Sequence, residues 1–419
     1  MGMTIAEKII ASHSGRDEVK PGEVVTARLD LIMGTDIATP LAIKVFREMD
    51  ASSVWDPERI ALVNDHFVPA KDVKAADFCR TLREFAREHN IKNYFEVGKS
   101  GISHVLLPEK GLVLPGDLVI GADSHTCTFG ALGAFATGVG STDMASGCAL
   151  GEIWLKVPET IRISYEGTLR MWVGGKDLVL YTLGKLGVRG ALYKCIEYTG
   201  DVISGLPMAD RFAMTNMAIE MGAKTGIIET DTVTENWLKG RTDRSFELVK
   251  NDADANFLEE IRIDCSQIEP MVALPHIPSK VKPVSDVKGI RIDEVFIGSC
   301  TNGRIEDLKI AADIIKGKKV AEGTRLLVIP ASQEVMIEMT RDGLTEIFLE
   351  AGAAVCTPTC GPCIGGHMGV LGKNEVGLFT SNRNFVGRCG DPTSEVYLSG
   401  PQVAAASSVT GYITHPDEL

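Results

Sequence analysis

The sequence lacks three features that would place it in other classes of protein. It has no run of Lys and Arg, no stretch of about 18 apolar residues that could span a membrane, and no N-terminal apolar segment of a secretory signal. Its formal net charge of −13 gives no basic surface for nucleic acid. We therefore expect a cytoplasmic protein without nucleic-acid or membrane partners, in which disulfide bonds are not expected.

Two phosphate-binding motifs are also missing. The glycine-rich stretch at 138–143 has Asp143 where a dinucleotide fingerprint requires its third Gly, and there is no phosphate loop of the Walker type. A protein this acidic needs a local cluster of Arg to hold an anionic substrate.

The composition is that of a globular protein of two or three domains, with 419 residues, 44% hydrophobic and 24% charged. Short apolar runs predict buried strands at 61–63, 118–120, 295–297 and 326–329. Helical patterns alternate with them, at 71–88, 206–222 and 304–316. This alternation predicts an α/β fold with mainly parallel sheets.

Proline marks the predicted domain boundaries. The stretch 274–284 contains three Pro among polar and basic residues, which is typical of an extended linker, and a weaker boundary lies near Val157-Pro158. We therefore predict three α/β domains, at 1–157, 158–284 and 285–419, the third of which carries the closely spaced cysteines.

Three of the ten cysteines, Cys356, Cys360 and Cys363, lie close together among Gly and Pro. Small residues let the backbone curl so that several thiolates point at one centre. The alternative is a pair of buried thiols in a tight turn. A structural zinc site would require a second C-x2-C pair, which the sequence lacks.

Another cysteine, Cys300, follows the apolar run at 295–297 and precedes a helical pattern. A helix N-terminus stabilises a thiolate at such a place, although an ordinary strand-end cysteine has the same pattern. Cys300, Cys360 and Cys363 together would supply three ligands to a cubane iron–sulfur cluster. One iron would then lack a protein ligand and could act as a Lewis acid.

The spacing of Cys356, Cys360 and Cys363 also matches that of radical S-adenosylmethionine enzymes. In those enzymes the three cysteines follow the first strand of a barrel, whereas here they lie near the C-terminus. The context therefore disfavours a radical enzyme.

Polar residues follow two of the predicted strands. Asp123, Ser124 and His125 come after the run at 118–120, and Asp65-His66 comes after 61–63. The carboxyl ends of buried strands hold the active sites of many α/β proteins, and an adjacent Asp can orient a His and raise its pKa. The alternative for the dipeptide is a capping Asp beside a surface His.

A pair of arginines, Arg383 and Arg388, follows a further apolar run at 377–379, with Asn382 beside them. Arg binds carboxylates through bidentate hydrogen bonds, so these side chains could hold a dicarboxylate. The alternative is a pair of solvated surface arginines. His104 and Glu197 are unremarkable by themselves.

Four of these motifs, in this order, resemble the aconitase superfamily. They are Gly-Ala-Asp-Ser-His-Thr at 121–126, Gly-Ser-Cys-Thr-Asn at 298–302, Cys-Gly-Pro-Cys-Ile-Gly at 360–365 and Asn-Arg-Asn-Phe-x-Gly-Arg at 382–388. Any one of them would be weak, but the ordered set spans nearly the whole chain.

The resemblance implies three α/β domains around a central 4Fe–4S cluster, one per subunit. It assigns cluster ligation to Cys300, Cys360 and Cys363, leaves one iron without a protein ligand, and gives Cys356 no role. It also implies an iron–sulfur-dependent hydro-lyase.

The same resemblance implies roles for the polar residues. Asp65 and His66 are similar to the pair that protonates the departing hydroxyl, and Arg383 and Arg388 to the arginines that bind carboxylates. His104 with Asp123, and His125 with Glu197, are similar to pairs that orient the substrate. Ser124 and Asn382 are similar to residues that contact the substrate, and Asn382 also to one that contacts the cluster region.

The family's fourth, mobile domain, which carries a catalytic Ser, is absent from this sequence. The length is similar to that of large subunits whose fourth domain is a separate small subunit, so the resemblance implies a partner of roughly 160–200 residues, the size of one domain. Where aconitase has a Gln that contacts substrate, this sequence has Met33-Gly-Thr35-Asp36, so the roles of Thr35 and Asp36 stay open.

The implied substrate is a small dicarboxylate of the substituted-malate type. The sequence of a large subunit does not distinguish an enzyme that uses isopropylmalate from one that uses homoaconitate, dimethylmalate or a citramalate-type substrate. The frequency of leucine biosynthesis among such chains favours isopropylmalate. One aconitase relative also binds RNA, but the acidity of this chain argues against that activity.

Overall fold

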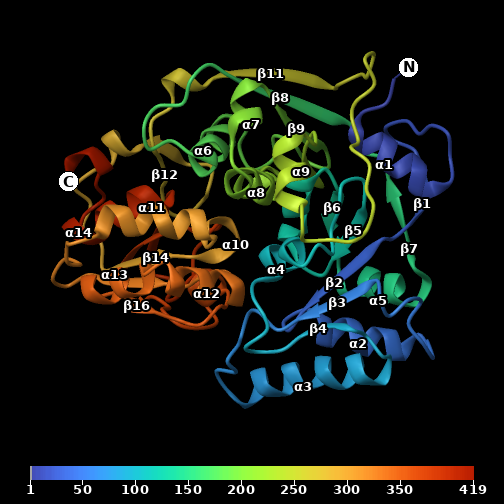
Figure 1. Cartoon of the computed structure of the whole chain (residues 1–419), viewed down its shortest axis with the longest axis horizontal. Coiled ribbons are helices and arrows are strands. Elements are labelled where there is room, and N and C mark those ends of the chain that lie inside the picture. Colours follow the sequence, from blue (N-terminus) through green and yellow to red (C-terminus); the bar gives the residue numbers. More distant parts are fainter. Residues whose placement is uncertain (1) are drawn as a thin grey trace. The chain divides into compact units, whose positions relative to one another are not determined.

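The structure is a computed structural model and describes residues 2–419 (Figure 1). The chain forms two compact units. Unit 1 contains the chain up to Lys99, Leu106–Glu166 and Ala191–Ile263, and unit 2 contains Ser100–Val105, Gly167–Gly190 and Asp264–Leu419.

Unit 1 is built on a five-stranded parallel sheet with β2 at its centre. Every residue of β2 is buried, as expected for a parallel strand covered on both faces. The carboxyl ends of the strands share one edge, where Asp36, Asp65 and Asp123 follow β2, β3 and β5. The strands, in sheet order, are β4 (Asn93–Phe95), β3 (Ile60–Val63), β2 (Leu31–Thr35), β5 (Leu118–Gly121) and β6 (Phe135–Gly138).

Helices cover this sheet in unit 1, and α2 and α3 lie on one side of it in Figure 1. Asp72 caps α3 by accepting a hydrogen bond from the Ala75 N–H at 2.8 Å, and the buried face of α3 repeats from Ala75 to Ala86 with helical spacing. The helices and 3-10 helices of unit 1 are α1 (Ile5–Ser14), α2 (Thr39–Glu48), α3 (Val73–Glu88), η1 (Ser124–Leu132), α5 (Ser141–Leu150), α7 (Asp201–Gly205), α8 (Met208–Asn216), η2 (Met217–Met221) and α9 (Thr232–Leu238).

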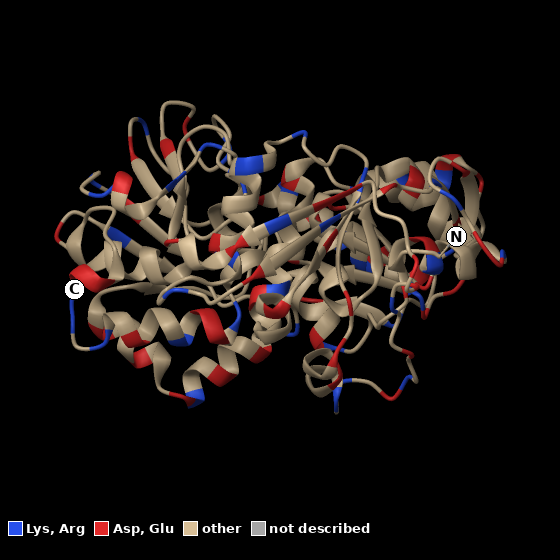
Figure 2. Ribbon diagram, turned by 90° about the horizontal axis from the view of Figure 1, so that it is seen from above, with Lys and Arg blue, Asp and Glu red and all other residues tan. Residues whose placement is uncertain are grey.

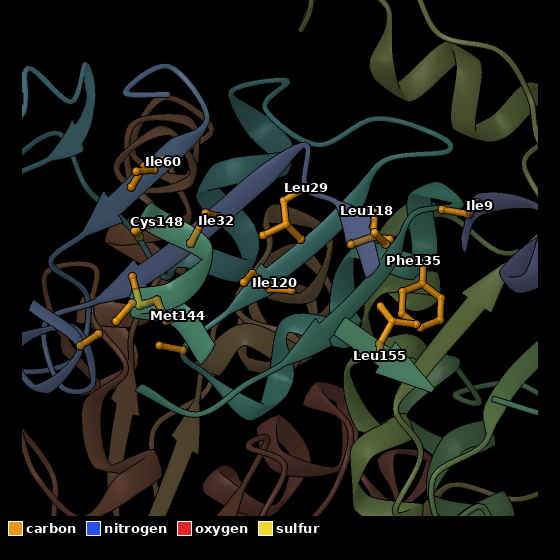
Figure 3. Close-up of a cluster of buried hydrophobic side chains, with 14 of the residues drawn as sticks. Ile9, Leu29, Ile32, Ile60, Leu118, Ile120, Phe135, Met144, Cys148 and Leu155 are labelled. Atoms are coloured by element: carbon orange, nitrogen blue, oxygen red, sulfur yellow. The ribbon is translucent and has the colours of Figure 1, made fainter. Parts of the chain in front are cut away.

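One apolar core joins the sheet to α1, α5 and a two-stranded antiparallel pair, β1 (Val24–Arg28) with β7 (Glu152–Lys156). Figure 3 shows part of this core, in which Ile32 of β2, Ile120 of β5 and Met144 of α5 are buried together. Burial of such side chains stabilises each by about 1.5–3 kcal/mol relative to exposure. The core therefore fixes the strands whose ends carry the polar residues.

A second sheet of unit 1 has the order β10 (Thr225–Ile228), β9 (Cys195–Thr199), β8 (Thr160–Glu166) and β11 (Glu259–Asp264). The 3-10 helix η1 packs directly on β10 through two glycines. A Cβ at Gly130 would lie 1.7 Å from the carbonyl oxygen of Gly226, so only Gly permits this approach. The contact positions the start of η1, which carries Ser124 and His125.

Unit 2 contains a seven-stranded sheet whose last five strands are parallel. Its order is β13 (Val281–Pro283), β12 (Met271–Ala273), β18 (Glu395–Leu398), β17 (Val376–Phe379), β14 (Glu294–Ile297), β15 (Arg325–Val328) and β16 (Ala354–Val355). Its own apolar core lies between this sheet and helices that include α11 and α14.

The helices of unit 2 include the connections between its parallel strands β14 to β17. They are α6 (Gly175–Leu186), η3 (Cys265–Gln267), η4 (Val284–Asp286), α10 (Ser299–Asn302), α11 (Ile305–Ile315), α12 (Gln333–Arg341), α13 (Leu344–Ala351), η5 (Gly361–Ile364), α14 (Pro401–Thr410) and η6 (Pro416–Glu418). The remaining helix, α4 (Ser103–Glu109), begins in the segment 100–105 of unit 2 and ends in unit 1.

The α/β fold with mainly parallel sheets predicted from the sequence is confirmed, and the predicted strands correspond to β3, β5, β14 and β15. The division into domains at 157 and 284 stays a prediction. The Pro-rich stretch 274–284 forms the turn and second strand of the β12–β13 hairpin within unit 2, because β13 pairs with β12.

Among residues 2–419, no helix combines the length and the apolar character that crossing a membrane requires. Figure 2 shows Lys and Arg scattered singly among more numerous Asp and Glu.

Candidate active site

His66 lies at the carboxyl edge of the five-stranded sheet of unit 1 and is surrounded by carboxylates. Its Nδ1 is 2.6 Å from an oxygen of Asp65, and its Nε2 is 3.7 Å from an oxygen of Asp123. The side chain is 7% exposed, so the alternative of a surface His is wrong.

The carboxylates control the charge of His66. Burial alone would lower the pKa of His66, but the charges of Asp65 and Asp36 outweigh it and raise that pKa well above its usual value. The bond from Nδ1 to Asp65 leaves Nε2 as the nitrogen that can exchange a proton with another molecule. The arrangement suits a general acid at neutral pH.

His125 is the second histidine at this candidate site, and its carboxylate partner differs from the prediction. Its Nε2 is 2.9 Å from Glu220 on η2. Within residues 2–419, Glu197 makes its contacts elsewhere: it accepts a hydrogen bond from Asn251 at 2.8 Å and lies 3.5 Å from Arg162. The pairing of His125 with Glu197 was therefore wrong, because Asn251 and Arg162 engage the Glu197 carboxylate and Glu220 pairs with His125.

Hydrogen bonds between η1 and α8 hold His125 in place. Asn216 donates its side-chain N–H to the hydroxyl of Thr128 at 2.8 Å, and the Thr215 hydroxyl donates to the carbonyl of Thr128 at 2.8 Å. At the other end of the turn, the carboxylate of Asp123 accepts the backbone N–H of His125 at 2.8 Å. Ser124, half-buried, lies between them.

Glu220 could have been suspected from the sequence. It is the one charged residue in the apolar run Met217-Ala-Ile-Glu-Met221, within the stretch predicted as helical. A carboxylate buried on such a helical face needs a partner. The sequence does not say which histidine provides it.

In unit 2, two of the predicted cluster thiols meet at one amide. The side chain of Asn382 has its N–H 3.3 Å from the sulfur of Cys300, and its oxygen 3.6 Å from the sulfur of Cys363. Cys360 immediately precedes η5, the turn that contains Cys363. All three cysteines are buried and none forms a disulfide.

The loop that carries Cys300 has a restricted backbone. Ser299 has a φ of 78°, in the left-handed region that is uncommon outside glycine. The Thr380 hydroxyl both accepts the N–H of Gly298 and donates to its carbonyl, each at 3.0 Å, so the ends of β14 and β17 are joined. Such conformations persist where surrounding contacts fix them, often at functional sites.

A buried cation lies behind this loop. The Lys176 ammonium on α6 donates to the carbonyls of Thr380 and Ser381 at 2.7 Å each, and to Asn302 at 3.3 Å. Burial lowers its pKa to about 8, although nearby Cys300 and Cys363 thiolates favour the charged form. The donor set of three thiols, one amide and one cation fits an anionic iron–sulfur cluster.

Arg383 and Arg388 are half-buried. This exposure does not decide between a carboxylate-binding site and a pair of solvated surface arginines. The Nε of Arg388 donates to the carbonyl of Cys363 at 2.9 Å, so it packs against the turn that carries that thiol. Asn384 instead has a structural position, because it donates to the carbonyls of Leu274 and Val396.

Two further predicted residues lie in unit 2. His104 is buried on α4, and its carbonyl accepts a hydrogen bond from Arg304 at 3.4 Å. Cys356 follows β16, is only partly buried, and has its sulfur 4.0 Å from the carbonyl of Ala354. Neither position assigns a catalytic role.

Comparison with known proteins defines the class first. The family model of the Aconitase family (aconitate hydratase) matches residues 7–290 and 280–411. The chain belongs to the aconitase family, whose members carry a 4Fe–4S cluster.

Several relatives are similar over their full length. The chain is 58% identical over 419 residues to a protein of Thermodesulfovibrio yellowstonii and 57% identical over 419 residues to one of Moorella thermoacetica, and both matches cover 100% of each chain. Both relatives are named 3-isopropylmalate dehydratase large subunit. A Pyrococcus furiosus protein, named 3-isopropylmalate dehydratase large subunit 1, is 58% identical over 420 residues, covering 100% of this chain and 99% of that protein.

A solved structure shares the fold at low sequence identity. Aconitase X of Thermococcus kodakaraensis, in its holo-form, matches 90% of this chain and 88% of its own with a TM-score of 0.50 and 14% identity. This likeness supports the aconitase-type fold and nothing finer.

Proposed function

We propose that the chain acts as the large subunit of a 3-isopropylmalate dehydratase, a hydro-lyase of leucine biosynthesis. The enzyme interconverts 2-isopropylmalate and 3-isopropylmalate by dehydration and rehydration. The observation that carries the chemistry is His66, buried among carboxylates that keep it protonated. The full-length relatives named for this enzyme carry the choice of substrate.

The cluster is the first part of the proposal. Cys300, Cys360 and Cys363 would hold a 4Fe–4S cluster with one iron free of protein ligands. When bound, the cluster supplies a Lewis acid for the hydroxyl oxygen of the substrate. The Asn382 amide orients two of the thiolates, and the Lys176 ammonium offsets part of their negative charge.

Proton transfer is the second part. His66 donates the proton that leaves with the hydroxyl as water, and Asp65 holds its Nδ1 so that Nε2 faces the reaction. Asp123, Ser124 and His125 orient the substrate, with Glu220 fixing the His125 ring. His104 remains a proposed orienting residue.

Binding of the two carboxylates is the third part. Arg383 and Arg388 provide the local positive charge that an acidic chain needs for a dianionic substrate. Their forked guanidinium groups also stabilise the charge that develops on a carboxylate when the neighbouring carbon loses its proton.

The base that removes this proton comes from a partner. The relatives' names describe large subunits, and we propose that a separate small subunit carries the catalytic Ser on a swivelling domain. A cytoplasmic location is part of the proposal, because ten cysteines that form no disulfide bond among residues 2–419 are typical of a protein from a reducing compartment.

An anaerobic assay tests the proposed function. The chain, with its cluster intact, is incubated with and without its small subunit and with 3-isopropylmalate, homoaconitate, 2,3-dimethylmalate and citramalate in parallel. Alkene formation or consumption is followed by ultraviolet absorbance. Turnover of 3-isopropylmalate that requires the small subunit is expected. Preference for another of these substrates would keep the mechanism and change the pathway.

A further inference from the structure

Asp36 is a buried carboxylate beside His66 that takes no part in the proposed chemical steps. It follows β2 directly and is 0% exposed. Its oxygens accept three successive backbone N–H groups, from Asp65 at 3.2 Å, His66 at 2.9 Å and Phe67 at 2.8 Å. One residue at the end of β2 thus holds the whole turn that follows β3.

This contact requires a charged acceptor. A carboxylate offers two oxygens with about four acceptor sites, whereas the Asn side chain offers one oxygen and would turn N–H groups toward the same donors. Hydrogen bonds from backbone N–H groups favour the ionised form, and the pKa of Asp36 is about 2, since these bonds and His66 outweigh burial. Asp36 is therefore an anion at every pH at which the enzyme would work.

The same anion also lies beside the imidazole. An oxygen of Asp36 is 3.6 Å from Nδ1 of His66, next to the shorter contact with Asp65. Two negative charges thus face one side of the ring, and Asp123 faces the other nitrogen at 3.7 Å. A further titratable group near Asp36 is Cys79 on α3, and burial raises the pKa of Cys79 to about 11, which keeps it neutral.

We propose that Asp36 is a positioning residue for the reaction: it fixes the Asp65–His66 turn and its charge keeps the His66 imidazole protonated for transfer to the departing hydroxyl. This inference rests on the proposed function. It gives a role to Asp36, which lies in the segment where aconitase has a Gln that contacts substrate.

A metal site is the competing explanation of the cluster. Asp36, Asp65 and His66 offer atoms within 4.8 Å of one another, a spacing that suits a metal ion. Both oxygens of Asp36 are already engaged by backbone N–H groups, and Nδ1 of His66 is directed at Asp65. Hydrogen bonding and charge pairing account for the arrangement, so no metal is required.

The test compares Asp36→Asn with Asp231→Asn, each in the complex with the small subunit. Asp231 is a matched control in unit 1, since it also accepts backbone N–H groups, from Val233 and Thr234, and pairs with a cation, Arg211. Asp36→Asn is expected to lower kcat at least about tenfold with little change in KM, because a misplaced acid loses part of the roughly 100- to 10,000-fold that such a group contributes. The pH above which kcat falls, the alkaline limit of kcat, should also be lower than in the wild type. Asp231→Asn should change neither.

A second readout does not depend on activity. The chain is labelled with ¹⁵N-histidine, and the His66 resonance is identified by its loss in His66→Gln. The titration of His66 is expected to move to lower pH in Asp36→Asn and to stay in place in Asp231→Asn. If the wild-type complex turns over no malate but this shift occurs, the positioning role stands and the proposed function fails.

A double-mutant cycle supplies the decisive control. If Asp36 acts through His66, adding Asp36→Asn to His66→Gln should lower the residual kcat no further. An equal further loss in both backgrounds, or Asp36→Asn with wild-type kcat and an unmoved His66 titration, would overturn the inference. Should Asp36→Asn not fold, Asp36→Glu replaces it. This variant keeps the charge but displaces the turn, so a lower kcat with an unmoved alkaline limit is expected, and wild-type kcat would count against the positioning role.

Discussion

The two units of the chain handle charge in opposite ways. At the sheet edge of unit 1, three carboxylates lie within 3.7 Å of the His66 imidazole, and two of them, Asp65 and Asp36, raise its pKa, so a positive charge there would be compensated within the protein. In unit 2, a buried cation, the Lys176 ammonium, lies close to the thiols Cys300 and Cys363. Under the proposed function, the first arrangement would donate a proton without any added group. The second would be completed by an anionic cluster that the thiolates hold beside the cation.

The largest expected effect separates cluster cysteines from the remaining ones. Cys363→Ser should lose the cluster and all dehydratase activity, because two thiolates do not retain a cubane cluster. Cys356→Ala is the matched control, seven residues earlier and only partly buried. It should keep both iron content and turnover. Iron and acid-labile sulfide analysis, with the visible absorbance of the cluster, makes the comparison. Loss of the cluster in Cys356→Ala would instead favour a radical enzyme.

A smaller effect is expected at His125, the second histidine of the candidate site in unit 1. Glu220→Gln should lower kcat by roughly a hundredfold, the cost of a misplaced orienting group, since His125 loses its charged partner. Glu197→Gln is the control, because Glu197 contacts Asn251 and Arg162 instead. Steady-state kinetics at saturating substrate distinguishes them. A larger loss in the Glu197 variant would restore the pairing predicted from the sequence.

The smallest effect is one of stability and concerns Glu197 alone. Burial raises its pKa to about 7 from an ordinary value of 4.5. A carboxyl group with a raised pKa in the folded state stabilises the protein below its unfolded pKa, and this contribution disappears as the pH rises through 7. The free energy of unfolding of the wild type should therefore fall by roughly 3 kcal/mol between pH 4.5 and 8 through this group.

Urea unfolding of wild type and Glu197→Gln across that range measures the effect. The variant should show a correspondingly smaller fall. Parallel curves for the two proteins would mean that Glu197 ionises normally in the folded chain.

The sequence predicted the polar residues at the carboxyl edge of the unit 1 sheet better than it predicted the residue that holds them in place. Asp65, His66 and Asp123 were found because each follows an apolar run that predicts a strand. The carboxyl ends of parallel strands meet at one edge of the sheet, so residues after such runs are expected to lie there. Asp36 occupies the same edge, but the strand before it, β2, was not predicted. Its role also depends on three N–H groups some 30 residues later in the chain.

Buried charges inside helices were harder to predict. Glu220 and Lys176 lie in η2 and α6, and tertiary packing decides which groups they contact. Such contacts cannot be predicted from a single sequence. The same limit explains Glu197, which is as buried as Glu220 but faces another part of unit 1. Proline was also ambiguous, since the stretch at 274–284 forms a hairpin where a linker was expected.

The central claim is that His66 delivers the proton in a dehydration. The most direct test compares kcat for 3-isopropylmalate in wild type, His66→Gln and His13→Gln, each with the small subunit and with equal cluster content. His13 is a matched histidine of unit 1, paired at 2.5 Å with Asp30 and outside the proposed site. The account predicts a loss of about 100- to 10,000-fold in His66→Gln with KM little changed, and wild-type kcat in His13→Gln. A His66→Gln enzyme with wild-type kcat, or one altered only in KM, would contradict it.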